Sequence, residues 1–159
     1  MKPVLLATDG SPTAAKATEA AIELAQLLET ELVVVCVWDL AYTTVGLAPM
    51  PISGQFAKVQ EGEARKVAAE AAARAEEAGV EACTVVLRGQ PVEEICLAAE
   101  RYAPRFLVIG SHGWGALKRA LFGSVSTGVL HRATCPVLVV RGEASDLEAA
   151  AERREQVSV

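Results

Sequence analysis

Several glycines and serines are spaced along the stretch VIGSHGWGALKRALFGSVSTGVL in a way that would suit an anion. Gly110 and Gly113 flank the end of an apolar run, and Gly123, Ser124 and Ser126 stand where a helix can begin. A phosphate site needs backbone N–H groups directed at one point, which glycines and a helix N-terminus both provide. The two serine hydroxyls would add donors. The alternative is structural: the glycines only end a strand, and Ser124 only caps a helix.

Other known nucleotide-binding and catalytic motifs do not match this stretch. The sequence GSVSTGVL lacks the Lys-Ser/Thr of a P-loop, and no GxGxxG follows the first apolar run. A nucleophile elbow around Ser111 would need glycine where Ile109 stands. A triad of Ser111, His112 and Asp9 is disfavoured, because adjacent residues at a strand exit tend to point apart. The sequence therefore predicts neither catalytic residues nor a metal site, and the four cysteines, without CxxC spacing, are expected to be reduced and buried.

Apolar runs and amphipathic segments alternate along the chain. Strands are predicted near 3–10, 31–39, 80–89, 105–110 and 135–141, and helices near 11–29, 61–79, 91–103 and 124–133. This alternation predicts an α/β fold with a parallel sheet covered on both faces. Residues 1–141 are expected to form a single domain, the segment 40–55 a flap or lid, and residues 142–159 a frayed helix or disordered tail.

Composition excludes several classes of protein. The 159 residues carry a formal net charge of −5, which argues against a nucleic-acid partner because the phosphate backbone attracts basic surfaces. No apolar run approaches the length of about 20 residues needed to cross a membrane. The N-terminus MKPVLLATDGS lacks the pattern of a signal peptide. We therefore expect a cytoplasmic protein without a membrane partner.

The glycine spacing Gly110-x2-Gly113-x9-Gly123-Ser124, with TDGS near the start and CPVLVVR near the end, resembles the universal stress protein family. The resemblance covers residues 2–141. It implies a Rossmann-like three-layer sandwich whose five-stranded parallel sheet has the order 3-2-1-4-5, with helices on both faces. It also implies ATP binding, with Mg²⁺ accompanying the phosphates, and homodimers. In that strand order the loops ATDGS and GSHGWG face one crevice.

Carried over by position, the resemblance implies nucleotide contacts at eleven residues. Near the adenine and ribose these are Ala7, Thr8, Asp9, Val37 and Ile109, and near the phosphates Gly110, Gly113, Gly123, Ser124, Val125 and Ser126. Asp9 would bond the sugar hydroxyls. Val37 and Ile109 come from the resemblance alone, whereas the glycines and serines also follow from the requirements of a phosphate site.

Three functions fit these features. The first is a non-enzymatic, ATP-binding regulator of the stress response, because the sequence offers an anion-binding segment but no group of catalytic residues. The second is a slow ATP hydrolase or phosphotransfer protein, with Ser124 or Ser126 as acceptor. The third is a dimeric interaction module without nucleotide. The apolar fifth strand, Pro136 to Val140, would lie at the sheet edge and is expected to pair with a second copy. No downstream protein partner follows from the sequence.

Overall fold

The computed structural model describes residues 1–39, 54–113 and 122–142. Strands and helices alternate along this part of the chain, in agreement with the sequence prediction. Their bounds are β1 (Val4–Ala7), α1 (Pro12–Leu27), β2 (Leu32–Trp38), α2 (Gly54–Glu77), β3 (Ala82–Arg88), α3 (Pro91–Tyr102), β4 (Phe106–Gly110), α4 (Ser124–Arg132) and β5 (Val137–Val140).

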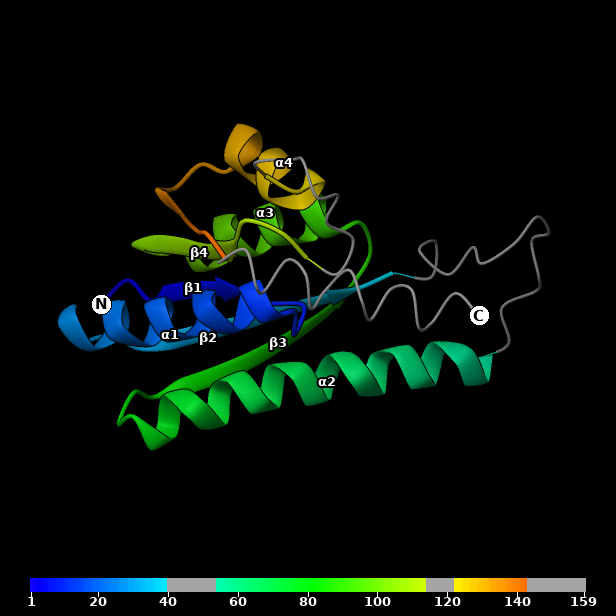
Figure 1. Ribbon diagram of the computed structural model, residues 1–159, viewed down its shortest axis with the longest axis horizontal. Coiled ribbons are helices and arrows are strands. Elements are labelled where there is room, and N and C mark those ends of the chain that lie inside the picture. Colours follow the sequence, from blue (N-terminus) through cyan, green and yellow to red (C-terminus); the bar gives the residue numbers. More distant parts are fainter. Residues whose placement is uncertain (40–53, 114–121, 143–159) are drawn as a thin grey trace.

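The five strands form one parallel sheet in the order β3-β2-β1-β4-β5 (Figure 1). This confirms the predicted α/β fold class and the strand order 3-2-1-4-5. β1 lies in the centre, where Ala7 pairs with Val35 of β2 on one side and with Ile109 of β4 on the other. The chain reverses its direction of winding at β1 and β4, and the loops that leave these two strands begin side by side.

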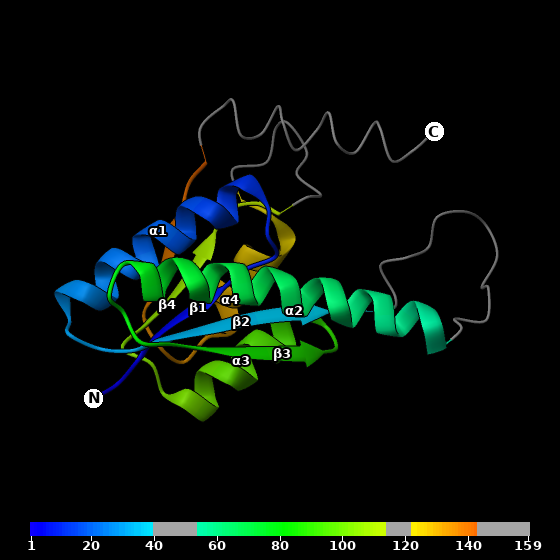
Figure 2. The same cartoon turned by 90° about the horizontal axis from the view of Figure 1, so that it is seen from below.

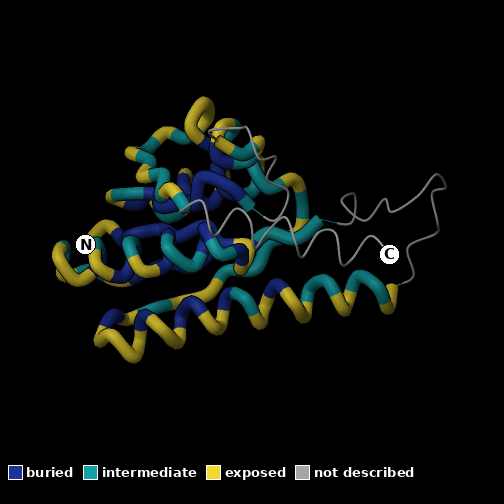
Figure 3. Tube along the Cα trace, in the orientation of Figure 1, coloured by how far each residue is buried: buried dark blue, intermediate teal, exposed yellow. Residues whose placement is uncertain are grey.

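The sheet is the middle of three layers (Figures 1 and 2). Strand residues alternate between its faces: Val4 and Leu6 pack with α1 and α2, whereas Leu5 and Ala7 pack with α3 and α4. Because both faces are covered, β1 is apolar and buried at all four positions, as Figure 3 shows for the centre of the molecule. The core therefore holds the carboxyl ends of β1 and β4 rigidly in place.

The helix α1 begins where its sequence predicts. Ser11 is the N-cap, its side-chain oxygen accepts a hydrogen bond from the Ala14 N–H (N···O 3.2 Å), and Pro12 occupies the first helical position. This cap fixes the path of the loop between β1 and α1.

The helix α2 starts earlier than predicted. The sequence indicated a helix from residue 61, but α2 begins at Gly54 and continues through Gly62. An interior glycine costs about 1 kcal/mol relative to alanine, which is too little to stop a long helix. Residues 54 and 55 therefore belong to α2 and not to the predicted flap, whose other residues, 40–53, lie outside the described part. Figure 2 shows the first turns of α2 extending past the carboxyl ends of β2 and β3.

The cysteines differ in exposure, contrary to the expectation that all four are buried. Cys36 and Cys96 are buried, Cys135 is half-buried and Cys83 is exposed; all four are free thiols. Cys83 lies on β3, which has a neighbouring strand on one side only, so this strand is less covered than the central ones.

None of the helices in the described ranges is both long enough and apolar enough to cross a membrane. The predicted tail falls outside the described residues from position 143 onward.

Candidate functional site

A cavity of about 640 Å³ lies beyond the carboxyl ends of β1, β2 and β4. Its volume is within the range of small-molecule sites. The structure brings together all eleven residues that the sequence singled out, because each of them lines this cavity: Ala7, Thr8, Asp9, Val37, Ile109, Gly110, Gly113, Gly123, Ser124, Val125 and Ser126. The strand order explains this result, since it places the loops after β1 and β4 beside each other.

The N-terminus of α4 opens into the cavity without a side-chain cap. Gly123 is the N-cap residue, and its own N–H donates to the carbonyl of Ser111 (N···O 2.6 Å). The first bond of the helix runs from the Thr127 N–H to the Gly123 carbonyl (N···O 3.0 Å). Within the described ranges, the N–H groups of residues 124–126 have no acceptor. Unpaired N–H groups and the helix dipole together favour an anion at this position.

The two serines of this turn have different roles. Ser124 is exposed, so its hydroxyl can donate to a ligand. Ser126 is buried, and its hydroxyl donates to the carbonyls of Ser111 (O···O 2.9 Å) and Gly123 (O···O 3.0 Å). The hydroxyl donor expected at Ser126 is therefore used inside the protein, and the same burial argues against this residue as a phosphate acceptor.

The loop after β1 is held in a fixed turn. The Asp9 carboxylate accepts from the Ser11 N–H (N···O 3.0 Å), and Gly10 adopts a positive φ of 75°. A Cβ on Gly10 would lie 3.0 Å from the side chain of Val67 on α2, so glycine is required there by both conformation and space.

Asp9 and Gly113 approach each other across the cavity. The second carboxylate oxygen of Asp9 occupies the space in which a side chain on Gly113 would begin. The loops after β1 and β4 thus face one crevice, as the strand order predicts. Any residue larger than glycine at position 113 must displace the Asp9 carboxylate.

Ser111 and His112 interact directly, contrary to the expectation that they point apart. The Ser111 hydroxyl lies 3.0 Å from Nδ1 of His112, and the Ser11 hydroxyl donates to the His112 carbonyl (O···O 3.4 Å). Ser111 is only 1% exposed. Its hydroxyl is therefore enclosed by the protein, and the contact is better explained as a support for the loop than as a nucleophile with its base.

The lining of the cavity is mixed in polarity, and its two sides differ. Strand β2 and helix α3 contribute the apolar residues Val37, Pro91 and Ile95 to one side, which we call the apolar end although Asp39 also lies there. Glycines and serines around β4 and α4 dominate the other side, which we call the polar end. The cavity also includes several residues that the sequence did not assign to the site, among them Asp39, Gln60, Glu63, Ala64 and Val67. Gln60 lies before the predicted start of α2, whereas Glu63, Ala64 and Val67 lie within the predicted helix, whose position over the strand ends the sequence did not indicate.

Cys36 also lines the cavity but is chemically inert. Burial, and to a smaller extent the negative charge of Asp9, raises the pKa of the Cys36 thiol from 9.0 to about 12. Within the described ranges, no three side chains of histidine, cysteine, aspartate or glutamate are grouped so that they could hold a metal ion.

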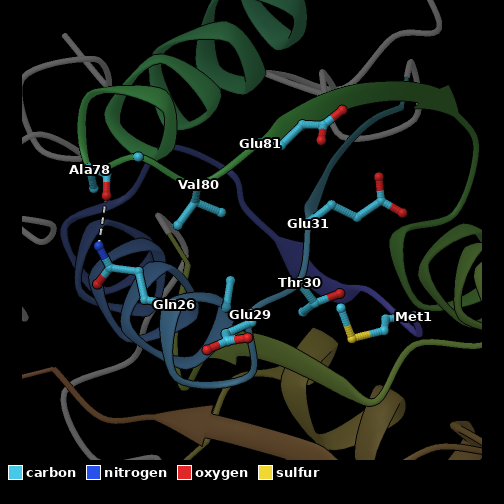
Figure 4. Close-up of a pocket in the computed structure, with 10 residues that line it drawn as sticks. Met1, Gln26, Glu29, Thr30, Glu31, Ala78, Val80 and Glu81 are labelled. Carbon is cyan, nitrogen blue, oxygen red and sulfur yellow. Dashed lines mark hydrogen bonds between the residues drawn. The ribbon is translucent and has the colours of Figure 1, made fainter.

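A second hollow, of about 660 Å³, lies at the opposite end of the sheet (Figure 4). The carboxylates of Glu29, Glu31 and Glu81 surround it, and the amide of Gln26 donates to the Ala78 carbonyl (N···O 2.7 Å) at its rim. All three glutamates are exposed. This hollow offers negative charge where a phosphate needs donors, so the crevice at the carboxyl ends is the better candidate for an anion.

Comparison with known proteins agrees with this architecture. A family model described as the universal stress protein family matches residues 1–141. The universal stress protein YxiE of Bacillus subtilis is 35% identical over 144 residues, which cover 87% of this chain and 97% of that protein.

Solved structures have the same fold. The protein MJ0577 superposes with a TM-score of 0.76 at 27% identity, with 89% of this chain and 96% of that chain covered. The universal stress protein of Archaeoglobus fulgidus, solved in complex with dAMP, gives a TM-score of 0.61 at 22% identity and covers 88% of this chain and 98% of that chain.

Proposed function

Because the chain belongs to the universal stress protein family, we propose that it binds an adenine nucleotide in the cavity beyond β1, β2 and β4. The observation that carries this proposal is the N-terminus of α4, where three N–H groups without an acceptor in the described residues meet the polar end of the cavity. Phosphate is the ligand group that this arrangement suits best. The dAMP bound to the Archaeoglobus fulgidus protein supports an adenine nucleotide as the ligand class.

The polarity of the cavity sets the orientation of the nucleotide. In this proposal the phosphates bind at Gly110, Gly113 and residues 123–126, and the base binds between Val37 on β2 and Ile109 on β4; all of these residues line the cavity. Asp9, between the two ends, accepts hydrogen bonds from the ribose hydroxyls. The polar end suits a charged chain of phosphates, because each hydrogen bond to a charged group contributes about 1.5–3 kcal/mol.

The nucleotide we propose is ATP, with Mg²⁺ held by its phosphates. Magnesium commonly binds through nucleotide phosphates and retains several waters, so it does not need a complete protein site.

We assign this chain the role of a nucleotide-dependent regulator in the stress response. Hydrolysis requires a positioned water and a group that stabilises developing charge. Of the two serines considered as phosphate acceptors, Ser126 is buried and its hydroxyl is already bonded. If phosphate were released from ATP in proportion to protein concentration, and Gly113→Val abolished this release, the assigned function would change from a regulator to a slow ATP hydrolase.

The proposal is tested by calorimetric titration of ATP and Mg²⁺ into nucleotide-stripped protein. We expect micromolar binding by the natural sequence and its loss in Gly113→Val, because the new side chain displaces the Asp9 carboxylate. Gly62→Ala is the matched control: a Cβ there meets nothing within 4 Å, so binding is expected to be unchanged. Equal binding by Gly113→Val and the natural sequence, or no binding by the natural sequence, would reject the proposed site.

We further propose that the active form is a homodimer paired through β5. The strand Val137–Val140 lies at an edge of the sheet, carries only apolar side chains and exposes 40% of Leu138. The other edge strand, β3, ends in Arg88 and follows Glu81, and charges of this kind discourage pairing.

A further inference from the structure

An aromatic ring lies at the apolar end of the cavity. Trp38 is the last residue of β2, directly after Val37, and it lines the cavity. Its ring is half-buried and packs against the hydrophobic cluster beneath α1 and α2. The sheet alternation places Val37 and Trp38 on opposite faces of β2, so together they border the cavity from both sides of the strand end.

The Trp38 ring is held in position by the neighbouring strand. Trp38 pairs in register with Arg88, the last residue of β3, and the Gly89 N–H donates to the Trp38 carbonyl (N···O 3.0 Å). The guanidinium carbon of Arg88 lies 5.5 Å from the centre of the ring, within cation–π distance. Trp38 is among the residues that line the cavity, whereas Arg88 is not, so Arg88 contacts the ring from outside the lining.

Asp39, the residue after Trp38, is also held by a residue that follows β3. The side-chain amide of Gln90, which follows β3, donates to the Asp39 carboxylate, which follows Trp38 (N···O 3.2 Å). Ordering an aromatic side chain before a ligand arrives lowers the entropy that binding must overcome. A preordered ring at the apolar end of a cavity is suited to a flat, aromatic ligand group.

We propose that Trp38, held by Arg88, is the stacking platform for the nucleotide base and makes the site prefer purines to pyrimidines. This inference rests on the proposed nucleotide-binding function. Stacking strength grows with the overlapping ring area, so the two fused rings of a purine gain more from the indole than the single ring of a pyrimidine. Arg88 acts on the base indirectly, as a positioning residue for the ring.

The test compares ATP, CTP and inorganic tripolyphosphate, each with Mg²⁺, by calorimetry. The natural sequence is expected to bind ATP about tenfold more tightly than CTP, within the range of measured base–aromatic stacking. Trp38→Leu should lose about tenfold in ATP affinity, make ATP and CTP nearly equal, and leave tripolyphosphate binding unchanged. Trp38→Phe should retain most of the preference, and Arg88→Gln should lose part of it.

Arg101→Gln provides a matched control. Its guanidinium carbon lies 5.8 Å from the centre of the Tyr102 ring on α3, and neither residue lines the cavity. This variant removes the same kind of cation–π pair at another place, so the ratio of ATP to CTP affinity should be unchanged. A fall in that ratio in Arg101→Gln equal to that in Arg88→Gln would overturn the role assigned to Arg88.

Fluorescence gives a second readout that does not depend on the folding of Trp38→Leu. The chain contains two tryptophans, so Trp114→Phe leaves Trp38 as the only one. ATP should quench its emission, whereas tripolyphosphate should not. Equal ATP and CTP affinities, or equal effects of ATP and tripolyphosphate on emission, would overturn the stacking role and leave nucleotide binding intact. If neither ATP nor tripolyphosphate binds the natural sequence, the proposed function and this inference both fail.

Discussion

At the scale of single residues, position in the fold gives identical side chains different chemistry. The Cys36 thiol is enclosed between the sheet and α2, and its pKa is raised to about 12. Cys83 is exposed on β3, yet partial burial and the carboxylates of Glu31 and Glu81 also raise its pKa. Exposure therefore decides which thiol a reagent reaches, and local charge decides how fast it reacts.

We predict that iodoacetamide at pH 8 labels Cys83 first and Cys36 only after unfolding. Glu81→Gln should speed the labelling of Cys83 by roughly twofold, the size expected of an interaction between exposed groups, because removing a negative charge favours the thiolate. Glu77→Gln, on the exposed side of α2, is the control and should leave the rate unchanged. Peptide mass spectrometry of timed samples measures both rates. Faster labelling of Cys36 than of Cys83 in the folded protein would contradict this prediction.

The raised pKa of Cys36 also predicts how stability depends on pH. The folded state holds the neutral thiol more strongly than the unfolded state does, so this contribution is complete below pH 9 and is lost as pH rises from 9 toward 12. Above pH 9 the free energy of unfolding should fall by up to about 1.4 kcal/mol per pH unit through this group. Urea unfolding of the natural sequence and of Cys36→Ala at pH 8, 9 and 10 measures the difference, and equal slopes in the two proteins would argue against it.

Residue types and the family resemblance together predicted eleven positions that line the cavity, but they did not predict where each hydroxyl points. Ser124 and Ser126 are the same residue two positions apart, yet one is exposed and the other donates to Ser111. The helical turn between them sets this difference, because residues two apart lie on different faces of a helix. The sequence therefore identified the anion site more accurately than the donors within it.

At the scale of helices and strands, Gly128 shows why a weak helix former lies inside α4. A glycine inside a helix costs about 1 kcal/mol relative to alanine, which would make α4 locally less stable. In the structure, a Cβ on Gly128 would lie 2.7 Å from the side chain of Val92 on α3, so the glycine lets these two helices approach closely. Intrinsic helix propensity is thus outweighed by packing at this contact.

This contact yields a prediction with an internal control. Gly128→Ala should destabilise the protein by about 1 kcal/mol or more, because the steric cost exceeds the gain in helix propensity. Adding Val92→Ala should make Gly128→Ala less costly, since it removes the opposing methyl groups. Gly62→Ala in α2 has open space around it and should stabilise by up to about 1 kcal/mol. Urea denaturation gives all the free energies, and additive effects of the Val92 and Gly128 changes would exclude the proposed contact.

At the scale of the whole molecule, the sheet has two open edges with different character. The carbonyls of Pro136 and Val140 accept bonds from β4, so the backbone of Val137 and Val139, between them, faces the open edge. Pairing with a second copy of the chain through this edge would use the N–H groups of these two residues.

We therefore predict that Val139→Pro converts a dimer into a monomer at micromolar concentration. Proline removes the outward N–H of β5 while leaving the bonds to β4 in place. Leu138→Lys, which puts a charge on the exposed position of the strand, should have the same effect. Light scattering measures the mass, and circular dichroism confirms folding. A natural sequence that is already monomeric, or variants that remain dimeric, would rule out the β5 interface.

The alternation of strands and helices and the parallel sheet were predictable because each strand and helix has its own local period and because short connections constrain how they join. The strand order, and with it the meeting of the two loops, followed from the family resemblance and not from local pattern. The contact between Arg88 and Trp38 could not be predicted from the sequence, since it depends on the register of β2 against β3, which no local pattern specifies. The contribution of α2 to the cavity was missed for a different reason: it depends on how α2 packs over the carboxyl ends of the strands, and the amphipathic pattern of a helix does not specify that placement.

The unequal support of α2 has a consequence for hydrogen exchange. Residues 54–63 bury no side chain, whereas the other end of the helix packs through buried alanines, and Gln26 of α1 donates to the Ala78 carbonyl just beyond it. Amide protons should therefore exchange fastest in the first turns of α2 and slowest near its end. Gln60 and Glu63 in those first turns line the cavity, so a bound ligand slows exchange in the part of α2 that has least protection of its own.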